Sequence, residues 1–342
     1  MSSPREPERT LEVSGLQVSV GDHLVAVQDV SFEIGAGESV GLVGESGSGK
    51  TLTCRAILGL LPASGHVDAG RIVLGRDADE VELTGARRTT WDEVRGLRLG
   101  AVFQDPASYL NPAITVGHQL SEQLRVKRGL SRGEAHSRSV ELFAEVGLHD
   151  PASVYHQYPH QLSGGMLQRV LIAIAISCEP ELLIADEATT ALDVVIQAEI
   201  LELLQRLRRE HRLSLLLVTH DLAVVAESCE RILVMYAGEI VESGPTADVL
   251  GNPQHPYTQA LMRVATTGSW ERRQLDVIPG QPPAAGEAMP GCRFAPRCAY
   301  AAERCVAGPV SLTTIDEHRA ARCVLVEDAV AHPLRHVEEV PA

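Results

Sequence analysis

The stretch from Gly44 to Thr51 constrains this 342-residue chain more than any other part of it. It fits the pattern G-x-x-x-x-G-K-[ST], which is typical of a loop that binds phosphate groups. Glycines let the backbone turn back on itself, so that successive N–H groups point into one anion-binding concavity. A helix after such a loop adds its positive N-terminal end to the same phosphate. The residues assigned to this loop are Gly44, Glu45, Ser46, Gly47, Ser48, Gly49, Lys50 and Thr51.

The sequence on either side of the loop supports this interpretation. Residues 38–43 form a short, largely apolar run that predicts a buried strand, and residues 52–61 carry apolar positions suited to a helix on a sheet. In such a unit, we expect the Lys50 ammonium to reach the β- and γ-phosphates and the Thr51 hydroxyl to hold Mg²⁺. The expected ligands are therefore ATP and Mg²⁺.

Predicted strands and helices alternate along the middle of the chain. The expected strands cover residues 97–103, 182–187 and 213–219, and the expected helices cover residues 116–146, 162–177 and 194–210. This alternation predicts an α/β fold, a P-loop ATPase with a mainly parallel sheet covered by helices. Residues 11–20 and 27–34 alternate apolar and polar side chains and predict an antiparallel edge sheet, whereas the segment from Leu61 to Arg71 is expected to be a loop.

Polar residues follow three of the predicted strands. Asp186 and Glu187 come at the end of one strand, His220 at the end of the next, and Gln104 after Phe103. Because ligands on parallel sheets bind at the carboxyl ends of the strands, we expect these side chains to lie beside the phosphate loop. Asp186 then holds Mg²⁺ and Glu187 polarises the attacking water. His220 orients that water, and Gln104 senses the metal and the γ-phosphate.

The sequence Leu-Ser-Gly-Gly at residues 162–165 makes the resemblance to a known family specific. Together with the features above, it stands in the order found in ATP-binding subunits of ABC transporters, which the chain resembles from residue 11 to about 250. The resemblance implies that residues 186–193 are the Walker B stretch and the D-loop, which ends at Asp193. It also implies that Gln104 is the Q-loop residue and a metal contact, and that His220 is the switch histidine.

The resemblance further implies a dimer of two such domains with ATP at their interface. Ser163, Gly164 and Gly165 are then expected to contact the γ-phosphate bound by a second, similar subunit. Because a split site exists only in the closed dimer, hydrolysis is coupled to domain motion. Two positions depart from the usual pattern. Met166 stands where many members carry Gln, and Val20 stands where an aromatic residue usually stacks on adenine, with His23 as a candidate substitute. The adenine contact is left unassigned.

The last part of the chain carries a second set of features. Residues 252–261 resemble a stretch that marks oligopeptide and dipeptide importer ATPases, and residues 278–283 form a proline-rich connector. A cysteine-rich tail is similar to that of the same branch. Its four cysteines lie within 32 residues and are Cys292, Cys298, Cys305 and Cys323. Because disulfides are disfavoured in a reducing cytoplasm, and so short a tail hardly builds a core alone, we expect the thiols to bind metal.

Two kinds of metal site suit four thiolates. Structural zinc sites commonly use paired C-x₂₋₄-C motifs, whereas the gaps here are five, six and seventeen residues. This irregular, wide spacing favours a [4Fe–4S] cluster over zinc. Four unligated, buried thiols remain as the third alternative.

Charge and hydropathy exclude other classes of protein. The net charge of −15 argues against a general nucleic-acid binder. The longest apolar runs fall far below the ~18 residues that span a bilayer. Residues 1–10 are polar, predict a disordered leader and lack the apolar core of a signal peptide. We therefore expect a protein at the cytoplasmic face of the membrane, held there by partner subunits.

These observations predict an ATPase subunit that powers peptide uptake. Its expected partners are a second ATP-binding subunit, two transmembrane permease subunits and, indirectly, an extracytoplasmic binding protein. The expected units are residues 11–250, a nucleotide-binding domain with a helical subdomain at about 108–178, and residues 251–342, a small cysteine-rich extension. Two alternatives stay open: an importer ATPase for nickel or another small solute, and a soluble ABC-type ATPase that acts on DNA or ribosomes.

Overall fold

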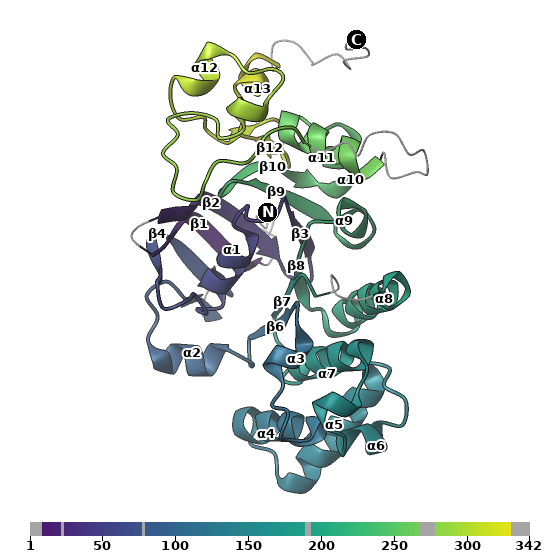
Figure 1. Cartoon of the computed structure of the whole chain (residues 1–342). Helices are drawn as coiled ribbons and strands as arrows, with labels where there is room; N and C mark the ends of the chain where they lie inside the picture. The colour runs from purple at the N-terminus through teal and green to yellow at the C-terminus, as the bar shows by residue number, and fades with distance from the viewer. Residues whose placement is uncertain (1–8, 22–23, 77–78, 189–192, 267–277, 330–342) are drawn as a thin grey trace, which may run out of the picture.

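A mainly parallel sheet of eight strands forms the core of the molecule (Figure 1). The computed structural model describes residues 9–21, 24–76, 79–188, 193–266 and 278–329. The sheet has the strand order β11-β12-β10-β9-β3-β8-β7-β6, and the strands from β9 to β6 run parallel. These five are β3 (Ser39–Val43), β6 (Leu99–Phe103), β7 (Leu182–Asp186), β8 (Ser214–Thr219) and β9 (Arg231–Tyr236). The predicted α/β fold with a mainly parallel sheet is confirmed.

Alternate residues of the central strands build a separate core on each face of this sheet. Leu215 and Leu217 of β8 belong to one hydrophobic cluster, and Leu216 and Val218 belong to the other. The first cluster is covered by α7 (Gly164–Ile176), α8 (Val194–His211) and α9 (Leu222–Ser228), and the second includes α1 (Lys50–Ile57). Both faces are thus buried, as expected for a parallel sheet.

The second sheet is antiparallel and has the order β2-β1-β4-β5. Its strands are β1 (Arg9–Val20), β2 (Leu24–Gly35), β4 (Gly65–Leu74) and β5 (Val81–Glu82), and α2 (Arg88–Val94) follows it. The predicted antiparallel edge sheet is therefore present. However, the expected loop from Leu61 to Arg71 is wrong beyond residue 64, because β4 begins at Gly65 and pairs with β1 from Val20 onward. Pairing with a long neighbouring strand extends β4 where its own sequence has no regular alternation.

A helical insertion lies beyond the β6 edge of the core sheet (Figure 1). Its helices are α3 (Pro106–Tyr109), α4 (Val116–Arg128), α5 (Arg132–Glu145) and α6 (Pro151–Tyr155), followed by α7, close to the expected bounds of about 108–178. The predicted continuous helical pattern at 116–146 is two helices. Gly129 ends α4 with a positive φ of 70°, and the Ser131 hydroxyl begins α5 by accepting from the Glu134 N–H.

The C-terminal extension continues the core sheet. After β10 (Glu239–Pro245), α10 (Thr246–Gly251) and α11 (Pro256–Thr266), the chain passes through α12 (Glu303–Val306), β11 (Thr313–Thr314), β12 (Ala320–Ala321) and α13 (Val324–Ala329). Strand β12 pairs with β10, and β11 pairs with β12. The expected small domain is therefore tied to the nucleotide-binding domain by strand pairing. In the part of the chain that the structure describes, no helix has both the length and the apolar character needed to cross a bilayer.

Candidate functional site

The phosphate-loop pattern forms a strand, a turn and a helix, as predicted. Strand β3 ends at Val43, the loop follows, and α1 begins at Lys50 with Gly49 as its N-cap at a φ of 105°. Gly44 has a φ of 154°, and a Cβ added there would lie 2.0 Å from the Met235 carbonyl oxygen. Because no side chain fits this space, the close approach of the loop to β9 requires glycine.

The Lys50 side chain is held against the loop. Its ammonium donates to the carbonyl oxygens of Gly44, at 2.7 Å, and Glu45, at 2.9 Å. The residue is 4% exposed, and burial lowers the pKa of Lys50, while the nearby carboxylates of Glu187 and Asp186 oppose that shift. A cation at the base of the loop suits a phosphate ligand.

A hydroxyl and a carboxylate form the adjoining polar pair. The Thr51 hydroxyl donates to the Asp186 carboxylate at 3.3 Å. Asp186 ends β7 and is 5% exposed, and burial raises the pKa of this carboxyl although the Thr51 hydrogen bond lowers it. Oxygen ligands of this kind fit Mg²⁺, which would compensate the buried charge.

Glu187 and His220 lie beside this pair. Glu187 has a φ of 49°, and its N–H donates to the Val218 carbonyl oxygen at 2.9 Å, so the residue after β7 is fixed to β8. Its carboxylate lies 3.8 Å from the His220 ring, which is about half exposed. The left-handed backbone at Glu187 costs free energy, and such strain often occurs at functional sites.

A cavity of about 330 Å³ lies at this site, and Lys50, Thr51 and Glu187 line it, whereas Asp186 and His220 do not. The loop residues 46–52 and Glu187 line it, together with residues from β2 and from the C-terminal extension. The structure therefore brings the phosphate loop and the predicted catalytic carboxylate to one hollow, at the carboxyl ends of the parallel strands.

Gln104 lies at the same edge of the sheet but does not line the cavity. Phe103 of β6 pairs with Asp186 of β7. Gln104, the next residue, therefore lies one position beyond Asp186 at the carboxyl end of the sheet. The Gln104 side chain is exposed to solvent. Its predicted metal contact stays a prediction.

The signature residues lie away from the cavity, at the start of α7. The Ser163 hydroxyl accepts from the Met166 N–H at 3.3 Å, and Ser163 and Gly164 are exposed. A Cβ added at Gly165 would lie 2.9 Å from the Ile196 side chain, so this turn packs on the start of α8. Asp193 is the N-cap of α8 and accepts from the Ile196 N–H at 3.0 Å. Residues 189–192 of the expected D-loop and His23 lie outside the described residues.

Two residues of the C-terminal extension hold the phosphate loop, and sequence reasoning missed both of these roles. The Tyr257 hydroxyl accepts from the Glu45 N–H at 2.8 Å. The Arg297 guanidinium donates to both carboxylate oxygens of Glu45, at 2.7 and 3.0 Å, and its side chain is 3% exposed. Arg297 and Glu45 are 252 positions apart, so no local pattern indicates their pairing.

The four cysteines of the extension line one small apolar pocket, together with His255 and Phe294. Burial raises the pKa of Cys292 to about 11, and it also raises the pKa of Cys298 and of Cys323. Two backbone N–H groups donate to sulfur, from Tyr300 to Cys298 and from Ala302 to Cys305, both at 3.4 Å. The structure thus gathers the thiols that the sequence singles out.

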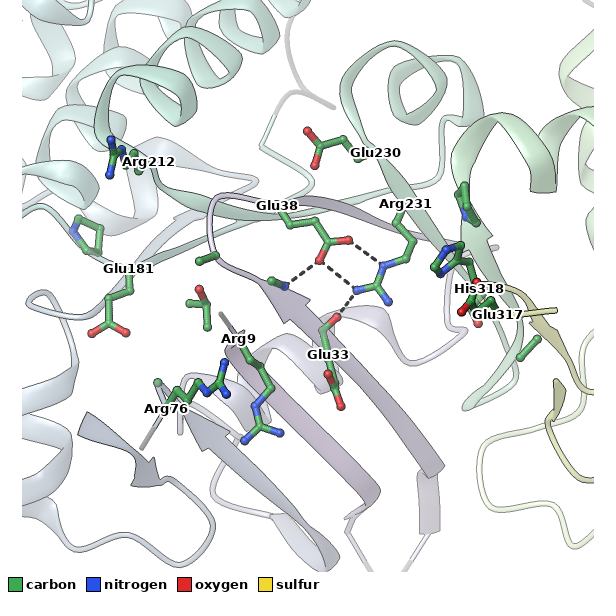
Figure 2. Close-up of a pocket in the computed structure, with 18 of the residues that line it drawn as sticks. Arg9, Glu33, Glu38, Arg76, Glu181, Arg212, Glu230, Arg231, Glu317 and His318 are labelled. Carbon is green, nitrogen blue, oxygen red and sulfur yellow. Dashed lines mark hydrogen bonds and ion pairs between the residues drawn. The ribbon is translucent and has the colours of Figure 1, made fainter. Parts of the chain in front are cut away.

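A wide groove lies at the opposite end of the sheet (Figure 2). This open groove, of about 2160 Å³, is lined by residues next to the amino ends of the parallel strands, including Glu38, Glu181 and Arg231. The Glu38 carboxylate accepts from Arg231 at 2.8 and 3.1 Å and from the Gly35 N–H at 2.7 Å. Because ligands of parallel sheets bind at the carboxyl ends, and these charges pair with one another, the groove is not the candidate site.

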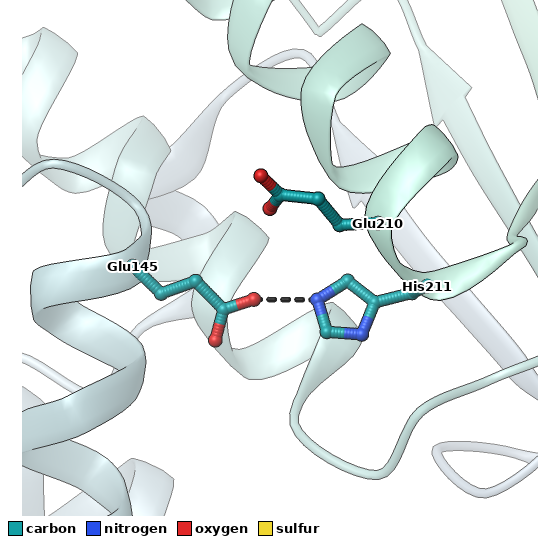
Figure 3. Close-up of side chains that lie close together, drawn as sticks. All are labelled: Glu145, Glu210 and His211. Atoms are coloured by element: carbon teal, nitrogen blue, oxygen red, sulfur yellow. Dashed lines mark hydrogen bonds and ion pairs between the residues drawn. The ribbon is translucent and has the colours of Figure 1, made fainter.

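Glu145, Glu210 and His211 form a separate polar cluster, shown in Figure 3. The His211 ring lies 2.5 Å from the Glu145 carboxylate, and the Arg206 guanidinium donates to the Glu210 carboxylate at 3.1 Å. Arg206 also donates to the Glu145 carbonyl oxygen at 2.6 Å. The contacts of His211 and Arg206 with Glu145 therefore tie α5 of the helical insertion to α8.

Comparison with known proteins agrees with this geometry. Residues 27–190 match the sequence family described as ABC transporter, and residues 241–305 match the family described as oligopeptide/dipeptide transporter, C-terminal region. The dipeptide transport ATP-binding protein DppD of Escherichia coli is 42% identical to this chain over 327 residues, which is 94% of this chain and 98% of that protein. The chain belongs to the ABC transporter ATP-binding family.

Two further relatives support the assignment of this ABC ATPase. The oligopeptide transport ATP-binding protein AppD of Bacillus subtilis is 44% identical over 304 residues, 89% of this chain and 92% of that protein. Among solved structures, an ATP-binding cassette in a dimeric, post-hydrolysis state with ADP and Pi superposes with a TM-score of 0.60 at 28% identity. That comparison covers 69% of this chain and 98% of the solved chain.

Proposed function

We propose that this ABC ATPase hydrolyses ATP with Mg²⁺ to power the uptake of peptides through a membrane permease. The observation that carries the catalytic part is the meeting of Lys50, Thr51, Asp186, Glu187 and His220 at one edge of the sheet. The matched C-terminal family and the names of the relatives support peptides as the transported class.

Each of these side chains has a separate role in the proposed mechanism. The Lys50 ammonium and the loop N–H groups bind the β- and γ-phosphates, and the Thr51 hydroxyl and Asp186 carboxylate hold Mg²⁺. When bound, Mg²⁺ neutralises charge on the phosphate oxygens. Glu187 accepts a proton from the attacking water, and His220, 3.8 Å away, orients Glu187 and that water.

The proposed working unit contains a second ATP-binding subunit. The exposed Ser163 and Gly164, with Gly165, are available to a nucleotide on that partner, since they lie outside this chain's own cavity. Val194 and Val195 at the start of α8 are 82% and 68% exposed, which suits residues that a partner covers. Asp193, Gln104 and the signature residues complete the two shared sites in this arrangement.

Two permease subunits and an extracytoplasmic peptide-binding protein complete the proposed importer, which places this chain at the cytoplasmic face of the membrane. The proposed division of the chain is residues 11–250 for nucleotide binding and 251–342 for the extension. An uptake assay tests the transported class. Cells that lack the endogenous importer regain uptake of a labelled dipeptide when this chain and its partner subunits are supplied. Uptake of nickel but not of peptides would contradict the proposal.

The Glu187→Gln variant tests the catalytic role directly. It is expected to slow steady-state ATP hydrolysis by about 10²–10⁴-fold, because it removes the proton acceptor while leaving the ATP contacts in place. It is also expected to accumulate as an ATP-bound dimer, measured by light scattering. Glu227→Gln, an exposed change on α9, is the matched control and keeps the parent rate. Hydrolysis at the parent rate by Glu187→Gln would rule out its assigned role.

We further propose that Cys292, Cys298, Cys305 and Cys323 hold a [4Fe–4S] cluster. All four line one pocket, and burial raises the pKa of Cys292, Cys298 and Cys323, so these thiols need a metal to become thiolates. Four sulfurs around one zinc ion would lie only about 3.8 Å apart. Among the described residues, no three of the cysteine sulfurs lie within 4.8 Å of one another. The one group of ligand atoms that close together in the described part of the chain is Glu145, Glu210 and His211. The wider spacing of the thiols favours the cluster.

Metal analysis of anaerobically purified protein decides between the alternatives. About four irons per chain, with matching sulfide and a broad visible absorption band, is the expected result. One zinc per chain without iron would replace the cluster with a structural zinc site, and neither metal would mean unligated thiols. Neither of these outcomes would affect the assignment of the nucleotide site.

A further inference from the structure

The cavity beside the phosphate loop has an apolar part in its lining. This part consists of Val25 and Ala26 of β2 and of Pro283, Ala284 and Ala285 of the C-terminal extension. We call residues 283–285 the strap. The strap lies in the same hollow as the phosphate loop and Glu187, although more than 230 positions of sequence separate it from the loop.

The strap is fixed to β2 by its neighbour Gly286. The Gly286 N–H donates to the Val25 carbonyl oxygen at 3.2 Å. Gly286 has a φ of 79°, and a Cβ added there would lie 2.7 Å from the Leu24 side chain. The strap is also held by a local turn, in which the Ala284 N–H donates to the Glu287 carboxylate at 2.9 Å. These contacts give the strap a defined place beside the cavity.

Besides Lys50 and Glu187, Arg293 is the charged side chain among the described residues that line the cavity. It is 7% exposed and donates to the Ala237 carbonyl oxygen at 2.9 Å and to the Gln28 side-chain oxygen at 2.7 Å. Its guanidinium therefore joins the extension to β2 and to the turn after β9. A planar cation held in this way suits the face of an aromatic ring.

The lining of the cavity points to a ligand with two chemically different parts. Phosphate groups need only the loop, Lys50 and Thr51. The remaining space is walled by small apolar side chains and one guanidinium, and none of the described lining residues is aromatic. Such walls suit a flat heterocycle, which gains from apolar contact and from a nearby cation.

We propose that the strap and the start of β2 form the seat for the base of the nucleotide, with Arg293 at its side. This inference rests on the nucleotide site proposed above and adds the residues that recognise the nucleoside. The C-terminal extension is then part of the ATP-binding site. Ala284 and Ala285 make the apolar contact that no aromatic side chain among the described lining residues provides.

Comparing two ligands on the full-length chain separates base recognition from phosphate recognition. ADP carries the base, whereas pyrophosphate carries only the phosphates. Ala285→Glu places a carboxylate in the seat and is expected to weaken ADP binding about tenfold while leaving pyrophosphate binding nearly unchanged, as titration calorimetry measures it. Ala285 is exposed, so the variant is expected to fold, and its melting temperature checks this. Ala284→Glu, at the other exposed strap position, gives a second test.

Two controls make failure interpretable. Ala288→Glu introduces the same charge three positions further on, outside the cavity lining, and is expected to change neither affinity. Lys50→Ala is expected to weaken both ligands. If Ala285→Glu leaves ADP binding intact, or weakens both ligands equally, the base seat is wrong. If Lys50→Ala weakens neither ligand, the nucleotide site itself is wrong.

Discussion

At the scale of single residues, the candidate site keeps charges where folding alone disfavours them. Asp186 is 5% exposed, and burial raises the pKa of its carboxyl, so the ionised form is penalised in the folded chain. The contribution of the Asp186 carboxyl to the free energy of unfolding therefore falls as pH rises through its folded-state pKa. At pH 7 the buried, ionised carboxylate destabilises the folded chain. A bound Mg²⁺ would offset this cost, which makes stability and function compete at this position.

Asp186→Asn is accordingly expected to stabilise the chain and to abolish its activity. The amide oxygen still accepts from Thr51 but carries no buried charge, so the melting temperature at pH 7 in EDTA should rise by a few degrees, as calorimetry would record. Mg²⁺-dependent ATP hydrolysis should fall by at least about 100-fold. Asp221→Asn, a change at the partly exposed N-cap of α9, serves as a carboxylate control and should not stabilise the protein. A lower melting temperature for Asp186→Asn would contradict the proposed cost.

The Arg297–Glu45 pair predicts that the extension positions the phosphate loop. Arg297→Gln and Glu45→Gln each break the bidentate ion pair between these residues, in which the Arg297 side chain is buried. Their double-mutant cycle should give a coupling of about 1–3 kcal/mol in the free energy of unfolding, measured by urea denaturation. ADP binding should weaken in both single variants, because the loop loses a support. The surface pair of Arg138 and Glu141 provides the comparison cycle, with a coupling below about 1 kcal/mol.

At the scale of elements, the phosphate loop depends on glycine at unequal positions. Gly44→Ala would place a Cβ 2.0 Å from the Met235 carbonyl oxygen and is expected to cost about 3 kcal/mol and to abolish ATP binding. Gly47 also has a positive φ, of 80°, but an added Cβ there meets nothing within 4 Å. Gly47→Ala should therefore cost only about 1 kcal/mol, from backbone strain. Equal losses in the two variants, measured by calorimetry and ATP titration, would mean that the contact with β9 is unimportant.

The sequence predicts elements well where their pattern is local. The strands β7 and β8 and the helices α7 and α8 follow short apolar runs with clear ends, and their observed bounds differ from the predicted ones by one or two residues. Strand β4 was missed over residues 65–70 because its pairing with β1 extends it through a stretch without alternation. The two-residue strands β11 and β12 depend on the edge of β10 and have no signal of their own.

At the scale of the whole molecule, the site residues that carry a local sequence pattern were predicted, and those placed by contacts between distant segments were missed. Lys50, Thr51, Asp186, Glu187 and His220 belong to contiguous motifs at strand ends, and parallel-sheet geometry brings strand ends together. Arg293 and the strap line the nucleotide cavity, and Arg297 binds Glu45 of the phosphate loop. All of these contacts arise only through tertiary packing. The resemblance at residues 252–261 marks the branch of the family but not these contacts.

Arg322 ties the three parts of the molecule together, which leads to a prediction about its overall stability. Its guanidinium donates to the carbonyl oxygens of Ile240, at 3.2 Å, and Val310, at 3.0 Å, and to the Asp29 carboxylate at 3.1 Å. These partners lie in the core sheet, the extension and the antiparallel sheet, respectively. Because the Arg322 side chain is only 10% exposed, its removal leaves buried carbonyl groups without a donor.

Arg322→Met keeps most of the side-chain volume and is expected to lower the free energy of unfolding by about 2–4 kcal/mol. Since β12 pairs with β10 in one sheet, the loss should appear as a downward shift of a single transition that tryptophan fluorescence and far-ultraviolet circular dichroism report together. Arg138→Met, on the surface of α5, is the matched control and should change stability by less than about 0.5 kcal/mol. A separate early transition, confined to the extension, would show that residues 278–329 unfold independently of the nucleotide-binding domain and that their contacts with the phosphate loop do not stabilise it.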